Sequence, residues 1–124
     1  MGGLTFDTGA LIGLERRKAQ ISRVFRAAMR ERVRITVPAP VIAEWWRGRT
    51  DIREFILASF DIEPLGTSLA QAAGEAIAAI PQATLVDAVV MASASRRGDV
   101  VYTSDLDDMV RLKAHFPNVR VLRA

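Results

Sequence analysis

The sequence predicts an α/β fold of three layers, in which a central, mainly parallel sheet is covered by helices on both faces. Short apolar runs, typical of buried strands, alternate along the chain with longer segments whose apolar residues repeat at helical spacing. The 124 residues are half apolar and a quarter charged, which suits one globular domain, 1–124, with a single core.

Five short runs predict the strands of this sheet. They are rich in apolar or β-branched residues, and prolines, glycines or acids close most of them. The first run ends in an acid and is followed by Thr8-Gly9, which predicts a turn. The expected strands are Leu4–Asp7, Arg34–Val37, Ile62–Leu65, Val100–Thr103 and Val119–Leu122.

Helical periodicity predicts the segments between the strands. Apolar residues from Ile21 to Met29 recur at i, i+3, i+4, i+7 and i+8, while arginines occupy the other face. The clearest helix begins at Thr84 and ends at the basic, glycine-terminated 96–98. The helices are expected over 21–29, 41–47, 51–60, 69–80, 84–97 and 105–114.

The net charge of +3 is unevenly distributed. The segment Glu15–Arg34 contains eight bases and two acids, a net of +6, so the rest of the chain carries nine bases and 12 acids, a net of −3. This asymmetry suits a polyanionic partner on one side and a carboxylate cluster on another. A solvated, arginine-rich helix face explains the basic segment equally well, so composition leaves the choice open.

Composition also excludes several classes of protein and site. Without cysteine there is no disulfide, thiolate zinc site or cysteine nucleophile, and His115 alone cannot build a multi-histidine site, so any metal is held mainly by oxygen. The longest uncharged stretches have 11 residues. Since spanning a membrane takes roughly 18, we expect no membrane segment, and in the absence of a leader pattern we expect a cytoplasmic location.

Four acids stand where the predicted elements meet, each beside apolar residues. Asp7 closes the first strand, and Asp105 follows the fourth strand by two residues. Ligands of open parallel sheets bind beyond such carboxyl ends. Glu44 and Asp87 fall near the starts of two predicted helices. A divalent cation would offset the cost of gathering these charges.

Helix capping explains some of these acids without a ligand. Asp87 stands three residues after Thr84, close to a capping-box arrangement, and Asp105 would cap its helix in a similar way. Glu44 has the weakest explanation of this kind, because it directly precedes Trp45-Trp46 in an apolar stretch. Together the four acids favour a functional site.

The order and spacing of five short motifs resemble the PIN-domain family, and specifically the short VapC toxins of prokaryotic toxin–antitoxin pairs. Each motif is weak alone, but together they cover essentially the whole chain. They are Leu4-Thr5-Phe6-Asp7-Thr8, Pro-Ala-Pro-Val-Ile-Ala-Glu (38–44), Val-Asp-Ala (86–88), Arg-Arg-Gly-Asp (96–99) and Thr-Ser-Asp-Leu-Asp-Asp (103–108).

The resemblance implies a PIN-like fold and a metal-dependent endoribonuclease, the toxin of a type II pair, that cleaves structured RNA such as tRNA or rRNA by two-metal phosphodiester hydrolysis. Carboxylate ligands without cysteine or clustered histidine suit Mg²⁺ or Mn²⁺. Thr8 and Thr103 match positions that orient the acids. The implied catalytic and metal-binding acids are Asp7, Glu44, Asp87 and Asp105, with Asp108, or Asp107 beside it, as an auxiliary acid.

The resemblance also implies partners. Family members are homodimers that a VapB-type antitoxin silences by lying along a groove of the toxin. Trp45 and Trp46 are about 100° apart on a helix, so one is expected in the core and the other in a partner or RNA groove, unless both pack in the core. Four bases of the positive segment are expected to bind the RNA: Arg16, Arg17, Lys18 and Arg23.

Gly9 departs from the family pattern, because many relatives carry serine or asparagine there; Met109 likewise stands where phenylalanine or leucine is common.

Two other functions fit parts of the sequence. The motif Asp7-Thr8-Gly9-Ala10 matches retroviral aspartic proteases, an all-β class at odds with the helical segments. A catalytically inactive α/β module that binds RNA or a protein would use the basic segment but leave Glu44 and Asp87 unexplained.

Overall fold

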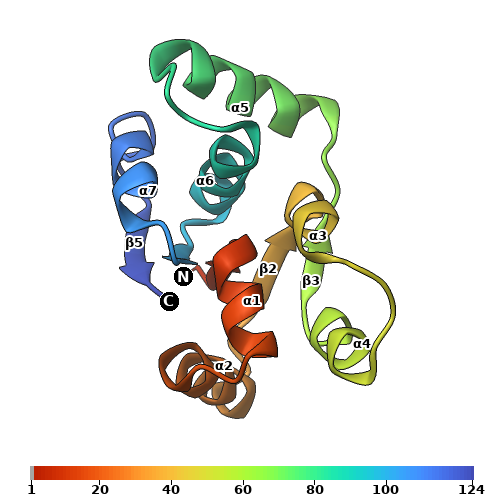
Figure 1. Cartoon of the computed structure of the whole chain (residues 1–124). Coiled ribbons are helices and arrows are strands. Elements are labelled where there is room, and N and C mark those ends of the chain that lie inside the picture. The colour runs from red at the N-terminus through yellow and green to blue at the C-terminus, as the bar shows by residue number, and fades with distance from the viewer. Residues whose placement is uncertain (1) are drawn as a thin grey trace.

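The computed structural model describes residues 2–124, and an entirely parallel sheet of five strands, in the order β3-β2-β1-β4-β5, lies at its centre (Figure 1). The register sets Thr5 beside Thr36 on one side and Val101 on the other. The chain order therefore reverses between β1 and β4. The strands are β1 (Leu4–Phe6), β2 (Ile35–Pro38), β3 (Asp61–Glu63), β4 (Val100–Thr103) and β5 (Arg120–Arg123).

Seven helices in residues 2–124 cover the two faces of this sheet. Crossovers between parallel strands are right-handed, so reversing the direction of travel moves the connecting helices to the opposite face. Figure 1 accordingly shows α1, α2 and α4 on one side of the sheet and α5 to α7 on the other, with α3 beside the end of β2 and in contact with both α1 and α6, which confirms the predicted α/β class. The helices are α1 (Thr8–Glu15), α2 (Ala19–Glu31), α3 (Ala39–Trp45), α4 (Asp51–Ala58), α5 (Thr67–Ala79), α6 (Leu85–Arg97) and α7 (Leu106–Leu112).

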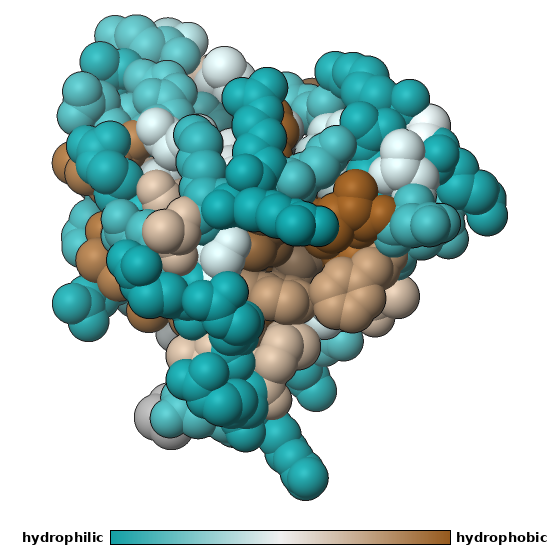
Figure 2. Space-filling model, turned by 60° about the horizontal axis from the view of Figure 1, so that its bottom comes forward, coloured by the Kyte–Doolittle hydropathy of each residue, from teal (hydrophilic) through white to brown (hydrophobic). Residues whose placement is uncertain are grey.

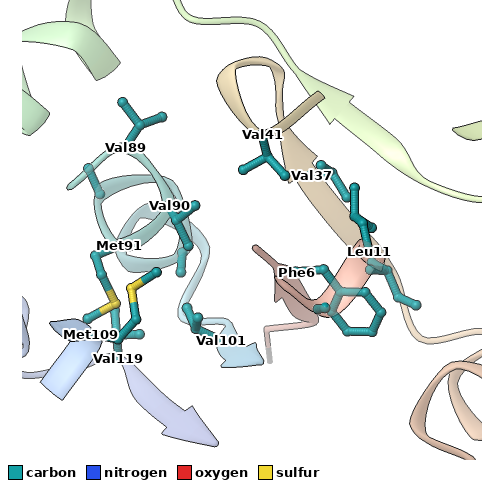
Figure 3. Close-up of a cluster of buried hydrophobic side chains, with 14 of the residues drawn as sticks. Phe6, Leu11, Val37, Val41, Val89, Val90, Met91, Val101, Met109 and Val119 are labelled. Carbon is teal, nitrogen blue, oxygen red and sulfur yellow. The ribbon is translucent and has the colours of Figure 1, made fainter. Parts of the chain in front are cut away.

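The core lies on both faces of the sheet and is built from small and branched apolar side chains (Figure 3). Phe6 of β1 meets Leu11 of α1 on one face, whereas Val90 of α6 and Val101 of β4 belong to the other, because Phe6 stands beside Tyr102 and successive strand residues point to opposite faces. Residues 88–94 of α6 are all buried, because α6 is enclosed between α5 and the sheet. A helix that is apolar all round is stable only in such surroundings.

A buried polar network ties the end of α6 to the beginning of β1. The carboxylate of Asp99, only 2% exposed, accepts hydrogen bonds from the Gly3 backbone N–H (2.7 Å), the Thr5 hydroxyl (2.8 Å) and the Arg97 guanidinium (2.8 Å). Arg97 also pairs with Glu63 of β3 at 3.1 Å. This network lies at the edge where β1 and β4 begin, so it holds the central strands in register.

The segment after β1 differs from the prediction of a turn at Thr8-Gly9. Helix α1 starts directly at Thr8, and Asp7 is its N-cap, with Oδ1 accepting a hydrogen bond from the Ala10 N–H at 2.9 Å. The α1 sequence is apolar on nearly all sides, so it carries no helical periodicity that would predict it. Gly9 has a different role, because a Cβ at this position would collide with the side chain of Ser104.

The other boundaries agree closely, and β4 spans its predicted residues. Helix α3 begins two residues earlier than expected because Pro40 fits the first turn of a helix. The aspartic protease alternative is wrong, since Asp7 follows a strand of a parallel α/β sheet rather than an all-β structure. Within residues 2–124, every helix is too short or too polar to cross a membrane.

Candidate metal centre

Four aspartates come from the ends of elements that meet at one edge of the sheet, where the chain order reverses between β1 and β4. Asp7 follows β1 directly, and Asp105 follows the last residue of β4 by two positions. Asp87 lies in the first turn of α6 and Asp108 in the first turn of α7. In open α/β sheets this is the edge at which ligands bind.

Three of these carboxylates are close enough to share a cation. Ligand oxygens of Asp87, Asp105 and Asp108 all lie within 4.8 Å of one another. Asp107, the neighbour that the sequence did not distinguish from Asp108, is exposed and outside this group. We call Asp87, Asp105 and Asp108 the aspartate cluster. The geometry therefore favours Asp108 over Asp107 as the auxiliary acid.

Asp7 lies beside the aspartate cluster but is held differently. Its side chain is 5% exposed, and one carboxylate oxygen is occupied by the N-cap bond to Ala10. Burial raises the pKa of Asp7, hydrogen bonds from Thr103 and Ala10 oppose that rise, and the negative charge of Asp105 adds to it. Asp7 is thus a fixed, buried carboxyl within electrostatic reach of the cluster.

Crowding of negative charge shows in the pKa of two cluster members. Burial raises the pKa of Asp87 from 3.8 to about 6, against a lowering hydrogen bond from Thr84, and the charges of Asp7, Asp105 and Asp108 raise it further. The pKa of Asp105 is raised mainly by a hydrogen bond with Asp108, then by burial and by the Asp108 charge. A cation bound between these carboxylates would lower both pKa values, because it would favour the charged forms.

Capping does not account for the cluster. Asp105 is the N-cap residue of α7, yet its side chain makes no capping hydrogen bond, and its backbone N–H donates to the Thr103 hydroxyl at 2.8 Å. At the start of α6 the hydroxyl of Thr84 accepts from the Asp87 N–H at 3.2 Å. The hydroxyl serves as the cap, so the Asp87 carboxylate remains available to the cluster.

Glu44 stands apart from the other acids. Val41 and Trp45 turn into the core, which leaves Glu44 exposed rather than enclosed by the apolar residues around it in the sequence. Its Oε1 accepts a hydrogen bond from the Thr8 hydroxyl at 2.6 Å. Thr8 follows Asp7, so this bond orients Glu44 near the site, although Glu44 is not one of the three acids within 4.8 Å of one another.

Two residues near the cluster were missed by the sequence analysis. Arg111 pairs with Asp108 at 2.7 Å, and among the ion pairs of residues 2–124 it is the one cation that contacts the aspartate cluster. The i,i+3 spacing of this pair was a usable signal. Ser104 packs against Gly9, and nothing in the sequence indicates that contact because it joins the loop after β4 to the first turn of α1.

The donor set fits a hard divalent cation. All the grouped ligand atoms are carboxylate oxygens, and negative neighbours contribute to the raised pKa values of Asp87 and Asp105, an effect that a bound cation would oppose. Oxygen-only ligation suits Mg²⁺ or Mn²⁺, and the chain has no cysteine and a single histidine to favour a softer metal.

The predicted RNA-binding bases lie away from the aspartate cluster. They are exposed and follow the end of α1, whose eight residues extend about 12 Å from Asp7. Their role in RNA binding stays a prediction. They are Arg16, Arg17, Lys18 and Arg23.

The two tryptophans have different surroundings. Trp45 is 3% exposed and donates its indole N–H to Glu15 at 3.0 Å, so it is a core residue and cannot line a groove. Trp46 is partly exposed and lines an apolar groove between α3, α4 and β3, together with Ile42, Leu57 and Ile62.

No protein-family model matches the sequence, and no curated protein is similar to it in sequence. Solved structures do resemble the fold. VapBC2 from Rickettsia felis, bound to a DNA fragment from its promoter, superposes with a TM-score of 0.76 at 12% identity over 98% of both chains. DNA-bound VapBC from Salmonella typhimurium gives 0.69 at 18% identity, over 99% of this chain and 98% of that one.

A toxin–antitoxin complex from Klebsiella pneumoniae is similar as well, with a TM-score of 0.70 at 18% identity, over 94% of this chain and 95% of that one. Identities this low establish the architecture and leave the activity to be argued from the site itself. The chain therefore has the α/β fold of the PIN domains found in VapBC toxin–antitoxin complexes.

Proposed function

We propose that this protein is a metal-dependent endoribonuclease and the toxin of a VapBC-type pair. One observation carries the proposal: the aspartate cluster lies at the edge of the sheet where a PIN-type fold reverses its chain order, and among the ion pairs of residues 2–124 only Arg111, at Asp108, brings a cation to its three carboxylates. A phosphodiester would be repelled from such a site without a cation. The site is therefore suited to chemistry on phosphate only when metal is present.

Each acid would have a distinct part in hydrolysis. Asp87, Asp105 and Asp108 would hold Mg²⁺ or Mn²⁺, which when bound supplies positive charge to the scissile phosphate and acidifies water. Asp7 would add a fourth, buried carboxyl beside these three, and its hydrogen bond from the Ala10 N–H would hold it in place. Glu44, exposed and oriented by Thr8, is suited to orient the attacking water or take its proton.

RNA cleavage with and without metal tests this activity. We expect the wild type to cut RNA with Mg²⁺ or Mn²⁺ and to lose this activity with chelator. Asp7→Asn and Asp108→Asn should each lose at least about 100-fold, because even outer-shell partners of metal ligands change activity by 10–100-fold. Asp107→Asn is the matched control, since Asp107 is an exposed neighbour outside the cluster.

Equal cleavage by every variant, or cleavage that survives chelation, would refute the proposal. If RNA binds in chelator and stays uncut when metal is added, the protein is instead the inactive binding module. Structured RNA such as tRNA or rRNA is the proposed substrate, and mapping new 5′ ends in cellular RNA after brief expression, beside Asp7→Asn, would identify it.

A VapB-type antitoxin is the proposed protein partner, since solved structures of similar fold are VapBC complexes. The apolar groove beside Trp46 is a candidate contact for it. Trp46→Ala should weaken antitoxin binding and leave the unfolding midpoint nearly unchanged, whereas Trp45→Ala should lower the midpoint because Trp45 is a core residue. Parallel losses in both measurements for Trp46→Ala would indicate a packing role only. The homodimer stays a prediction, which light scattering coupled to gel filtration would test.

A further inference from the structure

Three helix ends in residues 2–124 share one backbone motif, a left-handed residue followed by a hydrogen bond that closes the last turn. At the end of α6 the left-handed residue is Gly98 (φ 70°), and the Asp99 N–H bonds to the Ala94 carbonyl at 3.0 Å. The equivalent residues after α1 and α2 are Arg17 (φ 57°) and Arg32 (φ 54°), the two non-glycine residues of positive φ in this part of the chain.

The motif is as complete at the arginines as at the glycine. The Lys18 N–H bonds to the Gly13 carbonyl at 2.9 Å after α1, and the Val33 N–H bonds to the Ala28 carbonyl at 2.9 Å after α2. This is the arrangement for which glycine is the usual residue, because a Cβ in the left-handed region crowds the backbone. Arg17 and Arg32 thus occupy left-handed positions at which glycine is the favoured residue.

Contacts within the molecule do not explain these arginines. Both side chains are exposed, and neither guanidinium takes part in the ion pairs formed within residues 2–124. An exposed arginine in the left-handed conformation lowers stability, and no ion pair within residues 2–124 offsets that cost. Such departures from local preference are most common at functional surfaces.

Helix α2, between the two turns, departs from local preference in the same direction. Arg23, Arg26 and Arg30 follow one another at i, i+3 and i+7, so they form one exposed row of like charges that repel one another. Lys18 at the N-cap makes no side-chain capping bond, and the first turn contains no acid to complement the helix dipole. The first turn therefore gains nothing from the helix dipole, whereas Arg30 in the last turn complements it.

We call the row and the two turn residues the α2 arginine stripe: Arg17, Arg23, Arg26, Arg30 and Arg32. Its last member, Arg32, lines a pocket with Gly3 and Asp99, at the edge of the sheet where β1 and β4 begin. The 13 residues of α2 separate its ends by about 20 Å. Figure 2 brings forward the face on which α2 lies at the bottom of Figure 1, and hydrophilic side chains cover much of that face.

We propose that the α2 arginine stripe binds the sugar–phosphate backbone of RNA and holds the substrate while it reaches the aspartate cluster. Guanidinium groups bind phosphate through paired hydrogen bonds, and a row of them without acidic partners matches a strand of regularly repeated phosphates. The inference rests on the proposed ribonuclease function. Because α1 separates Arg17 from Asp7, only an RNA long enough to span both regions would use the stripe.

Replacing Arg17 and Arg32 by glycine should raise thermal stability and lower RNA affinity. Each substitution should raise Tm by about 2–4 °C, because it relieves the left-handed conformation. The double variant should bind a fluorescein-labelled RNA hairpin at least about 10-fold more weakly at low salt in the presence of chelator. Its slope of log affinity against log salt should fall by between about 1.4 and about 1.8, because each lost contact contributes about 0.7 on a single strand and about 0.9 on a duplex.

Two controls separate charge from conformation. Arg17→Lys with Arg32→Lys keeps the charge and the strained backbone, so Tm should stay near the wild-type value, with most of the RNA affinity and salt slope retained. Gly98→Arg places arginine in the third motif, where an added Cβ meets open space, so it should lower Tm by about 2–4 °C without strengthening RNA binding.

Unchanged RNA affinity and salt slope in the double glycine variant would overturn the inference, whatever happens to Tm. A fall in Tm with unchanged RNA affinity would assign the arginines a structural role, and loss of antitoxin binding with intact RNA binding would assign the stripe to the protein partner; each outcome contradicts RNA binding here. If the wild type shows stripe-dependent binding but never cleaves RNA with metal, the proposed activity fails while the surface stands. If the wild type cleaves RNA and the double variant has an unchanged KM, the proposed activity stands while the RNA-binding role of the stripe fails.

Discussion

Raising the pH through 6 should destabilise the metal-free protein, because Asp87 binds its proton more tightly in the folded state than in the unfolded one. The pKa of Asp87 is about 6 in the folded protein and near 3.8 without the surrounding structure. Between these values the native state holds more protons than the unfolded state. The free energy of unfolding therefore decreases as pH rises across this window, and the contribution is lost above it.

The size of the effect follows from the shift. The difference between 6 and 3.8 is 2.2 pKa units, which corresponds to about 3 kcal/mol for a fully buried group. Asp87 is partly exposed, and screening by solvent reduces this to about 1–2 kcal/mol. The pKa values of Asp7 and Asp105 are also raised, so their contributions have the same sign.

Urea unfolding in chelator at about pH 4.5 and 7.5 measures the difference. The wild type should lose about 1–2 kcal/mol between these pH values, whereas Asp87→Asn should lose less and exceed the wild type in stability at the higher pH. Asp107→Asn, an exposed acid outside the cluster, should keep the wild-type dependence. Stability that is flat or rises across this window, or an equal slope in Asp87→Asn, would refute this account. Added Mn²⁺ should restore stability at the higher pH because it binds the folded state.

Three further substitutions test single contacts. Arg111→Gln should tighten Mn²⁺ binding about 2–5-fold in a calorimetric titration, because it removes a cation that competes for Asp108 at the surface. Gly9→Ala should lower the free energy of unfolding by about 1–3 kcal/mol through its collision with Ser104, and adding Ser104→Gly should recover most of that loss; no recovery would place the strain elsewhere. Asp99→Ala should destabilise by about 3 kcal/mol in urea, since it leaves a guanidinium and a buried hydroxyl without their acceptor; a loss below about 1 kcal/mol would show that the network is dispensable.

Arg120→Gln is the matched control for Arg111→Gln. Arg120 begins β5 and contacts no acid within residues 2–124, so Arg120→Gln removes the same charge without touching the aspartate cluster. Its Mn²⁺ affinity should equal that of the wild type. An equal gain in both variants would show a general effect of net charge rather than competition for Asp108.

Much of the fold could be predicted because its signals are local. The strand Val100–Thr103 and the helix that follows Thr84 have clear composition and caps, and both appear as expected. Helix α1 could not be predicted in the same way. Its residues are apolar on nearly every side, so the sequence contains no period of 3.6. Asp7 was expected only as the end of a strand, and its role as the N-cap of α1 is apparent in the structure.

The candidate site was predictable in part for a similar reason. Asp7 and Asp105 follow strands, and the rule that ligands bind at the carboxyl ends of a parallel sheet is enough to place both acids at the same edge. The sequence does not predict which side chains on different helices lie close together. That Asp108 rather than Asp107 faces Asp87 depends on how α7 rotates against α6, and that Glu44 is exposed depends on which face of α3 packs inward.

The aspartate cluster and the α2 arginine stripe suggest an order of events on RNA. Both features lower the stability of the protein, one by crowding carboxylates and the other by like charges and left-handed arginines. Without metal the cluster repels phosphate while the stripe still attracts it. Chelated protein should therefore hold RNA through the stripe without cutting it, and metal should raise cleavage far more than it raises affinity. A metal-dependent rise in RNA affinity as large as the rise in cleavage would place the main binding contacts at the cluster instead.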